Sequence, residues 1–227
     1  MEVNSFKKVA HLVTVGTVML AIPQIVPAAG PDPAKPYITS IGYSGTGCPQ
    51  GSVGQSFSND RLMFTLIFDN FGASTGPGVL VTEAKKNCIV NLTLQLPKGS
   101  STWVQTSLAR GYVQLPAGQT AALTSITTLA NPAGEGRDGE DPEDGSGVSR
   151  RTSRTDFKGA ISKDYTAAEG HAYQVQTGCG REQPSTRTLS LNYTLQVSPG
   201  PTVAQATVDS LDGMMVVQAV KSCKADD

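Results

Sequence analysis

The stretch NCIVNLTLQL, from Asn87 to Leu96, predicts a β-strand with one buried face. Successive side chains of a strand point to opposite faces of a sheet. Apolar residues at every second position therefore indicate one face on the core and one face in solvent. The apolar set is Cys88, Val90, Leu92, Leu94 and Leu96, and the alternating set is Ile89, Asn91, Thr93 and Gln95.

A second segment, TRTLSLNYTLQV from Thr186 to Val197, repeats this alternation. Turn residues separate several further short apolar runs, and no comparable run with the helical period of about 3.6 residues follows the first 30 residues. We therefore expect an all-β fold, an antiparallel two-sheet β-sandwich of about eight to ten strands. The inward set here is Leu189, Leu191, Tyr193, Leu195 and Val197.

The whole chain has 227 residues, a length that suggests one domain or at most two. Only 16% of the residues are charged, while 24 are glycine and 14 are proline, which favours a turn-rich β protein over a helical one. The formal net charge of −1 gives no electrostatic basis for binding nucleic acid. A single domain is expected over residues 37–227, after a proline-rich lead-in at residues 30–36.

Residues 1–29 have the pattern of a secretory signal peptide. Two lysines precede an apolar run at residues 9–26, and the small residues Ala28 and Ala29 offer a cleavage site. A membrane anchor is the alternative, but Pro23 and Pro27 interrupt the segment, and no second long apolar run follows. We expect a secreted, extracellular protein without membrane attachment after cleavage.

Four cysteines remain, at Cys48, Cys88, Cys179 and Cys223. An even number in an exported chain is typical of disulfides, although four cysteines allow three pairings and the sequence alone does not choose between them. We predict Cys48–Cys88 and Cys179–Cys223, because these partners are nearest in sequence. No two cysteines have the close spacing of a zinc site, and no metal or cofactor is expected.

The glycine-rich stretch YSGTGCPQGSV, from Tyr43 to Val53, is a candidate phosphate-binding loop. Gly45 and Gly47 match the start of a dinucleotide fingerprint, but the third glycine, Gly51, comes one residue late and no amphipathic helix follows. The stretch is better explained as a tight turn that carries Cys48 towards Cys88.

Catalytic residues are hard to find in this chain. His171 is the only histidine after the leader, so a cysteine or serine nucleophile would have to use it as its base; a surface position in a loop is the expectation. A glycosidase needs only two carboxylates, and Asp69, at the end of an apolar strand, is the best single candidate, with a capping or turn role as the alternative. The available carboxylates are Asp60, Asp69, Glu83, Asp156, Asp164 and Glu169.

Residues 131–156 break the strand pattern, with an acidic block followed by a basic block and almost no apolar side chains. Such a segment buries too little surface to offset its ordering entropy, so a flexible charged loop inserted between strands is expected. Calcium binding by residues 138–144 is an alternative, although the EF-hand spacing is missing. Further on, Asp212-Gly213 between two strand-like runs predicts a hairpin turn.

Two sequons, at Asn91 and Asn192, fall on the outward faces of their expected strands. Both asparagines are therefore predicted sites of N-glycosylation if the source is a eukaryote.

Several segments together resemble the domain-of-unknown-function 4360 family of small secreted proteins, found mainly in filamentous fungi. The resemblance runs from about Tyr37 to Cys223, and it implies secretion, disulfides and a fungal source but no established activity. The charged insertion at 131–156 is longer than the family pattern, and QAVKSC lacks the aromatic residue often found near the last cysteine. The matching segments are ITSIGYSGTGCPQGSV, FTLIFDNFGASTGPG, KKNCIVNLTLQLPKG, RGYVQLPAG, FKGAISKDY, CGREQPSTRTLSLNYTLQV and VKSC.

These patterns favour a non-catalytic module that binds a glycan of the cell wall or an extracellular protein. Exposed aromatic side chains would stack on sugars, but for each candidate taken singly a place in the core is the favoured interpretation. The second hypothesis is a secreted hydrolase that uses two carboxylates on a polysaccharide, and the third is an effector of a pathogen or symbiont. The candidate stacking residues are Trp103, Tyr112, Tyr165 and Tyr173.

Overall fold

A computed structural model describes residues 30–130, 148–177, 186–221 and 223. These residues form twelve β-strands and one short 3-10 helix, η1 (Val81–Ala84). The strands are β1 (Tyr37–Ser44), β2 (Val53–Phe57), β3 (Met63–Phe68), β4 (Gly72–Thr75), β5 (Lys85–Gln95), β6 (Gly99–Leu115), β7 (Thr120–Ala130), β8 (Val148–Lys158), β9 (Ile161–Thr177), β10 (Thr186–Val197), β11 (Ala204–Thr207) and β12 (Ser210–Lys221).

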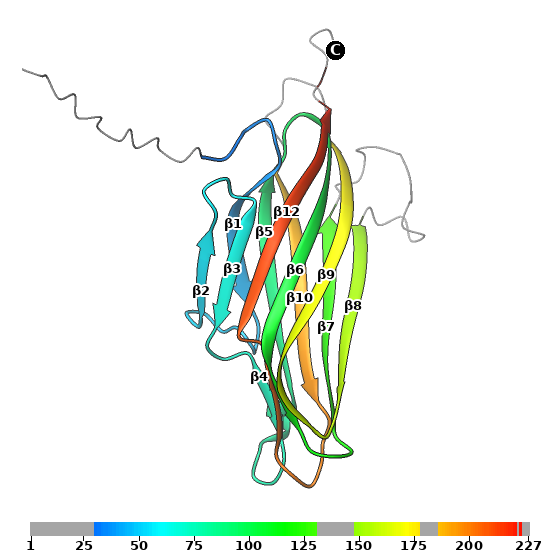
Figure 1. Cartoon of the computed structure of the whole chain (residues 1–227). Helices are drawn as coiled ribbons and strands as arrows, with labels where there is room; N and C mark the ends of the chain where they lie inside the picture. The colour runs from blue at the N-terminus through cyan, green and yellow to red at the C-terminus, as the bar shows by residue number, and fades with distance from the viewer. Residues whose placement is uncertain (1–29, 131–147, 178–185, 222, 224–227) are drawn as a thin grey trace, which may run out of the picture.

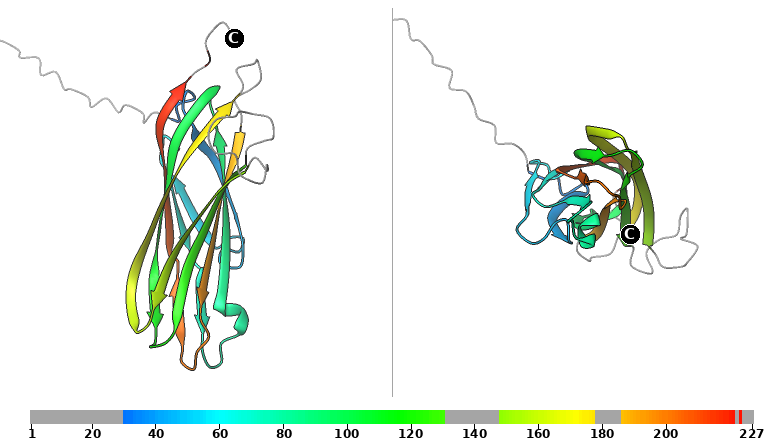
Figure 2. Two further views of the ribbon diagram at one scale, coloured as in Figure 1. Left: turned by 90° about the vertical axis from the view of Figure 1, so that its right-hand side faces the viewer. Right: turned by 90° about the horizontal axis from the view of Figure 1, so that it is seen from below.

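The strands build two antiparallel sheets that pack face to face (Figure 1). The first sheet has the order β1-β5-β10-β7-β8. In the second sheet, β2-β3-β12-β6 continues through β9 on the far side of β6, while β11 and β4 extend it beyond the end of β12. Figure 2 shows the two layers from the side where β8 and β9 form neighbouring edges. The predicted all-β sandwich is confirmed, with more strands than the eight to ten expected.

The alternation that predicted the core is present in the structure. Along β5 every second side chain is buried, and β10 pairs with β5 so that Leu191 lies opposite Val90 and Leu189 opposite Leu92. The inward side chains of both strands meet those of the second sheet in one hydrophobic core. Full burial of a leucine or valine side chain contributes about 1.5 to 3 kcal/mol, so this face supplies much of the stability of the sandwich.

The charged segment contains a strand where only a loop was expected. Residues 148–156 belong to β8, which pairs with β7 along its whole length, from Val148 opposite Ala130 to Lys158 opposite Thr120. The prediction was wrong for these residues because a strand at the edge of a sheet is held by its backbone hydrogen bonds, and charged side chains are common there. The acidic residues 138–144 lie outside the described residues.

The hairpin turn predicted at Asp212-Gly213 is also wrong. Both residues lie inside β12, where Gly213 pairs with Phe64 on one side and Ser107 on the other. A Cβ atom at Gly213 would collide with the Phe64 ring, so the glycine allows close packing and does not make a turn. β11 and β12 are both antiparallel to β6, so the chain keeps its direction through Val208 and Asp209, and β12 continues the course of β11.

Candidate functional site

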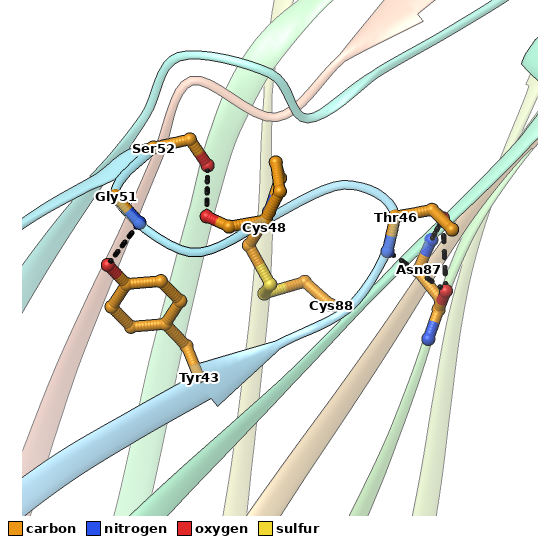
Figure 3. Close-up of a disulfide and its surroundings, with 8 residues drawn as sticks. Tyr43, Thr46, Cys48, Gly51, Ser52, Asn87 and Cys88 are labelled. Atoms are coloured by element: carbon orange, nitrogen blue, oxygen red, sulfur yellow. Dashed lines mark hydrogen bonds between the residues drawn. A yellow bond between two sulfur atoms is a disulfide. The ribbon is translucent and has the colours of Figure 1, made fainter.

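The glycine-rich stretch is the loop between β1 and β2, and a disulfide joins its Cys48 to Cys88 of β5 (Figure 3). The two Cα atoms are 5.4 Å apart and both cysteines are fully buried, so the expected pairing is confirmed. Gly45 has a positive φ of 141°, and a Cβ there would overlap the carbonyl oxygen of Asn87. Glycine is therefore required for the loop to approach β5 this closely.

Side-chain hydrogen bonds fix the same loop (Figure 3). The hydroxyl of Thr46 donates to Oδ1 of Asn87 over 3.0 Å, and the Asn87 backbone N–H donates back to the Thr46 hydroxyl over 3.1 Å. On the far side of Cys48, the Ser52 hydroxyl donates to the carbonyl of Pro49. The loop is thus held by a covalent bond and by polar contacts at both of its ends.

The second predicted disulfide falls partly outside the described residues. Cys223 is disulfide-bonded, but Cys179 lies in a segment that the structure does not describe. The pairing Cys179–Cys223 stays a prediction.

A polar hollow of about 510 Å³ lies beside the disulfide loop, and we call it the loop hollow. Two of the six candidate carboxylates, Asp69 and Glu83, line it together, and the structure adds Asp209 from the connection between β11 and β12. Glu83 forms an ion pair with Lys86 over 2.8 Å. The complete lining is Thr46, Pro49, Phe68, Asp69, Asn70, Phe71, Gly72, Glu83, Lys86, Thr207, Val208 and Asp209.

The hollow is assembled from segments that are distant in sequence. Phe68 donates its backbone N–H to the Asp209 carbonyl over 2.9 Å, which holds the connection between β3 and β4 against the connection between β11 and β12. Within the described part of the chain, the Asp69 and Asp209 carboxylates have neither a hydrogen bond nor an ion pair. Asp209 gives no local signal in the sequence, because only the pairing of β12 with β3 places it here.

Three other candidate carboxylates have surface or turn roles. Asp60 accepts hydrogen bonds from the Ser58 hydroxyl and from the backbone N–H of Leu62, and these bonds lower its pKa. Asp156 forms an exposed ion pair with Arg154, and Asp164 is exposed on β9. Asp60 thus has a turn role, whereas the capping or turn role was the alternative stated for Asp69, whose carboxylate has no such hydrogen bond among the described residues.

The sixth carboxylate, Glu169 of β9, lies in the interior with its side chain only 8% exposed. The Tyr193 hydroxyl donates to Oε1 over 2.5 Å, and the Ser125 hydroxyl donates to Oε2. Tyr193 and Ser125 belong to the first sheet and Glu169 to the second, so this carboxylate connects the two sheets. His171 lies 3.7 Å away, in β9 and largely buried, so the predicted surface position in a loop is wrong.

Buried polar groups surround Glu169. Burial raises the pKa of Tyr193 well above its usual value, and the Glu169 carboxylate adds to the effect. Burial likewise raises the pKa of Tyr173. Gln105 and Thr127 face the same interior. Among the described residues, no group of three or more His, Cys, Asp or Glu side chains could hold a metal ion.

The aromatic residues proposed for sugar stacking are mostly in the core. Trp103, Tyr165 and Tyr173 are 0%, 8% and 3% exposed, so the stacking prediction is wrong for these three and the favoured place in the core is confirmed. Trp103 and Tyr173 contact each other with ring centroids 5.9 Å apart. Tyr112 is half-buried, and its hydroxyl is 2.6 Å from that of Ser162.

Both sequon asparagines lie on the outer face of the first sheet. Asn91 of β5 pairs with Ser190 of β10, and Asn192 pairs with Ile89, so the two asparagines are diagonal neighbours on the central strands. Both are half-exposed.

The predicted signal peptide, residues 1–29, lies outside the described residues. Among the helices of the described chain, none has the length and apolar character needed to cross a membrane.

The family profile named Domain of unknown function (DUF4360) matches residues 34–223. The chain belongs to this family. A relative from Arthroderma benhamiae, described as an uncharacterized secreted protein, is 39% identical over 136 residues. That match spans 60% of this chain and 49% of the relative, about half of its length. The expectation of a secreted protein is thereby confirmed.

Among solved structures, the chain resembles TmCBM61 in complex with β-1,4-galactotriose. The match has a TM-score of 0.29 at 10% identity and covers 80% of this chain and 91% of the other. A likeness at this TM-score carries no argument about the ligand of the present protein.

Proposed function

We propose that this secreted DUF4360 protein is a non-catalytic extracellular binding module that holds a glycan in the loop hollow. The observation that supports this most directly is the hollow itself, a concave site of about 510 Å³ lined by hydrogen-bonding side chains from segments that are distant in sequence. Binding sites for small ligands in proteins have volumes of about 300 to 1,000 Å³.

The chemistry of the lining fits a polyhydroxyl ligand. Asp69 and Asp209 offer carboxylate oxygens without partners in the described chain, and Asn70 offers both a donor and an acceptor. A hydroxyl that donates to a carboxylate makes a charge-assisted hydrogen bond, roughly twice as strong as a neutral one. Sugar hydroxyls supply such donors without bringing a charge of their own.

The site is also held in shape before a ligand arrives. The Cys48–Cys88 bond fixes the loop on one side, and the hydrogen bond between Phe68 and Asp209 joins two further connecting segments. A preformed site loses little conformational entropy on binding, so modest hydrogen bonds produce measurable affinity.

The test is a glycan array and a pull-down from fungal cell wall with the mature protein, followed by calorimetry on any glycan that binds. Asp69→Ala and Asp209→Ala should each weaken binding at least about tenfold, which corresponds to about 1.4 kcal/mol. Asp164→Ala is the matched control, because Asp164 is an exposed carboxylate on β9 outside the hollow. Blank arrays and pull-downs, or equal affinity in all variants, would overturn the proposal.

Hydrolysis of a polysaccharide is the second candidate, because Asp69 and Glu83 line the same hollow. A carboxylic acid that must stay protonated needs an apolar surrounding, whereas this hollow is polar and Glu83 pairs with Lys86. Binding is therefore the better-supported function. Release of reducing ends from a bound glycan, abolished by Asp69→Asn, would support hydrolysis instead.

A further inference from the structure

The outer face of the second sheet, which faces the viewer in Figure 1, carries large apolar side chains in solvent. Met63 and Ile67 of β3 are 47% and 58% exposed, and Met214 and Val216 of β12 are 40% and 42% exposed. Met63 and Met214 lie directly opposite each other in the ladder, and Val216 follows two residues after Met214, whereas Thr65 separates Met63 from Ile67. We call these four residues the apolar ridge.

Among the described residues of the first sheet, no large apolar side chain is comparably exposed. Along β5 and β10 its outward residues are mainly threonine, serine, asparagine and glutamine, as expected for a sheet face in water. Met63, Met214 and Val216 are neighbours, and a contiguous apolar surface on one face is characteristic of an interaction site.

On the other side of β6, the same face carries small side chains of β9. Ala168, Gly170 and Ala172 of β9 point outward and are exposed, and we call them the small-residue trough. Strand β6 separates the ridge from the trough, with half-exposed Val104 and Leu108 between them.

The apolar ridge and the small-residue trough lie opposite the same residues of β6. Thr106 of β6 pairs with Met214 on one side and with Gly170 on the other. In the same way, Val104 pairs with Val216 and with Ala172. Suppose that two copies face each other and are related by a 180° rotation about an axis that runs along β6 between them. The apolar ridge of each copy then lies over the small-residue trough of the other.

The charged side chains on this face do not oppose a face-to-face contact between two copies. In the rows from Val104 to Arg110, the outward side chains described on β3, β12, β6 and β9 include one cation and one anion, Arg110 and Asp212, which form an ion pair. Under the same rotation, each Arg110 approaches the Asp212 of the second copy as well as its own. The face is thus electrostatically complementary to itself.

We propose that two copies of this chain form a dimer by packing the outer faces of their second sheets together about a twofold axis along β6. Met214 of each copy then covers Gly170 of the other, and Val216 covers Ala172. Such an interface is isologous, since the same patch is used twice. No residue that lines the loop hollow belongs to this face, so the dimer is independent of the proposed glycan site.

The test measures the mass of the mature protein by sedimentation over a range of concentrations. A dimer is expected for the natural sequence, and Met214→Asp should weaken dimerisation at least tenfold. Gly170→Tyr should do the same by filling the trough. A Cβ at Gly170 meets its nearest neighbour, Cγ2 of Thr106, at an ordinary 3.5 Å, so the monomer should tolerate this change. Thr124→Asp, on the outer face of the first sheet, is the control.

A mixing experiment tests the register of the contact. Met214→Asp and Gly170→Lys chains should each be monomeric alone, but together they should associate, because one of the two contacts then joins opposite charges. A natural chain that stays monomeric at the highest concentration would overturn the proposal, as would dimers unaffected by the ridge and trough variants. Dimers that dissociate in the two variants while circular dichroism is unchanged would support it.

Discussion

Glu169 is the residue whose contacts tie the two sheets together by polar bonds. Its carboxylate accepts hydrogen bonds from Tyr193 and Ser125 across the interior of the sandwich. A buried carboxylate is stable only when such donors satisfy it, so its position depends on residues from three strands.

Glu169→Ala should lower the free energy of unfolding by about 2 to 3 kcal/mol, because two buried hydroxyls lose a charged acceptor. Urea unfolding followed by circular dichroism measures the change. Asp156→Ala is the control, since its ion pair with Arg154 is exposed and contributes at most about 1 kcal/mol. Equal losses in the two variants would contradict the structural role of Glu169.

The buried tyrosines predict a loss of stability in alkaline solution. Burial raises the pKa of Tyr165, Tyr173 and Tyr193 in the folded state, whereas an unfolded tyrosine ionises near pH 10. Above that pH the unfolded chain has released protons that the folded chain retains, so the free energy of unfolding falls as pH rises; below it these groups contribute no pH dependence.

Spectrophotometric titration checks this expectation. Part of the tyrosinate absorbance should appear only together with the loss of native circular dichroism. Ionisation of all six tyrosines near pH 10 in a folded protein would contradict it.

At the scale of elements, the disulfide between the β1–β2 loop and β5 closes a loop with a sequence separation of 40 residues. The chain-entropy estimate for a loop of this length is about 3 to 4 kcal/mol. The double variant Cys48→Ala/Cys88→Ala should therefore unfold at clearly lower urea concentration, by about that free energy. A midpoint unchanged within error would show that the bond does not contribute to stability.

The strands differ in how well their sequences predicted them. β5 and β10 lie in the middle of the first sheet with one face on the core, so their alternation of apolar and polar residues was sufficient. β8 is an edge strand whose inward residues include Ser149, Arg151 and Ser153, and it exists because β7 supplies a complete ladder. Asp212-Gly213 has the composition of a turn, yet neighbours on both sides keep it extended.

For the whole molecule, we expect the outer face of the first sheet to carry N-glycans and the outer face of the second sheet to form the dimer. N-glycans at Asn91 and Asn192 would cover the outer face of the first sheet and leave the second sheet free for dimerisation. Secretion from a eukaryotic host should give a protein that loses mass on treatment with an N-glycanase. Asn91→Gln and Asn192→Gln should each remove one glycan, and a mass that the enzyme does not change would refute both sites.

The all-β class, secretion and the family were predicted from the sequence alone, because period-two alternation, the pattern of a leader and family-specific segments are local signals. The sequence left three cysteine pairings open, and the structure selected Cys48–Cys88. Which carboxylates meet depends on the way the two sheets fold and pack. The tertiary structure brought Asp209 to Asp69 and buried Glu169 against the opposite sheet, and it hid Trp103 and exposed Met214. These outcomes depend on strand order and register between distant segments, because a side chain's surroundings are set by its ladder partners and by the facing sheet.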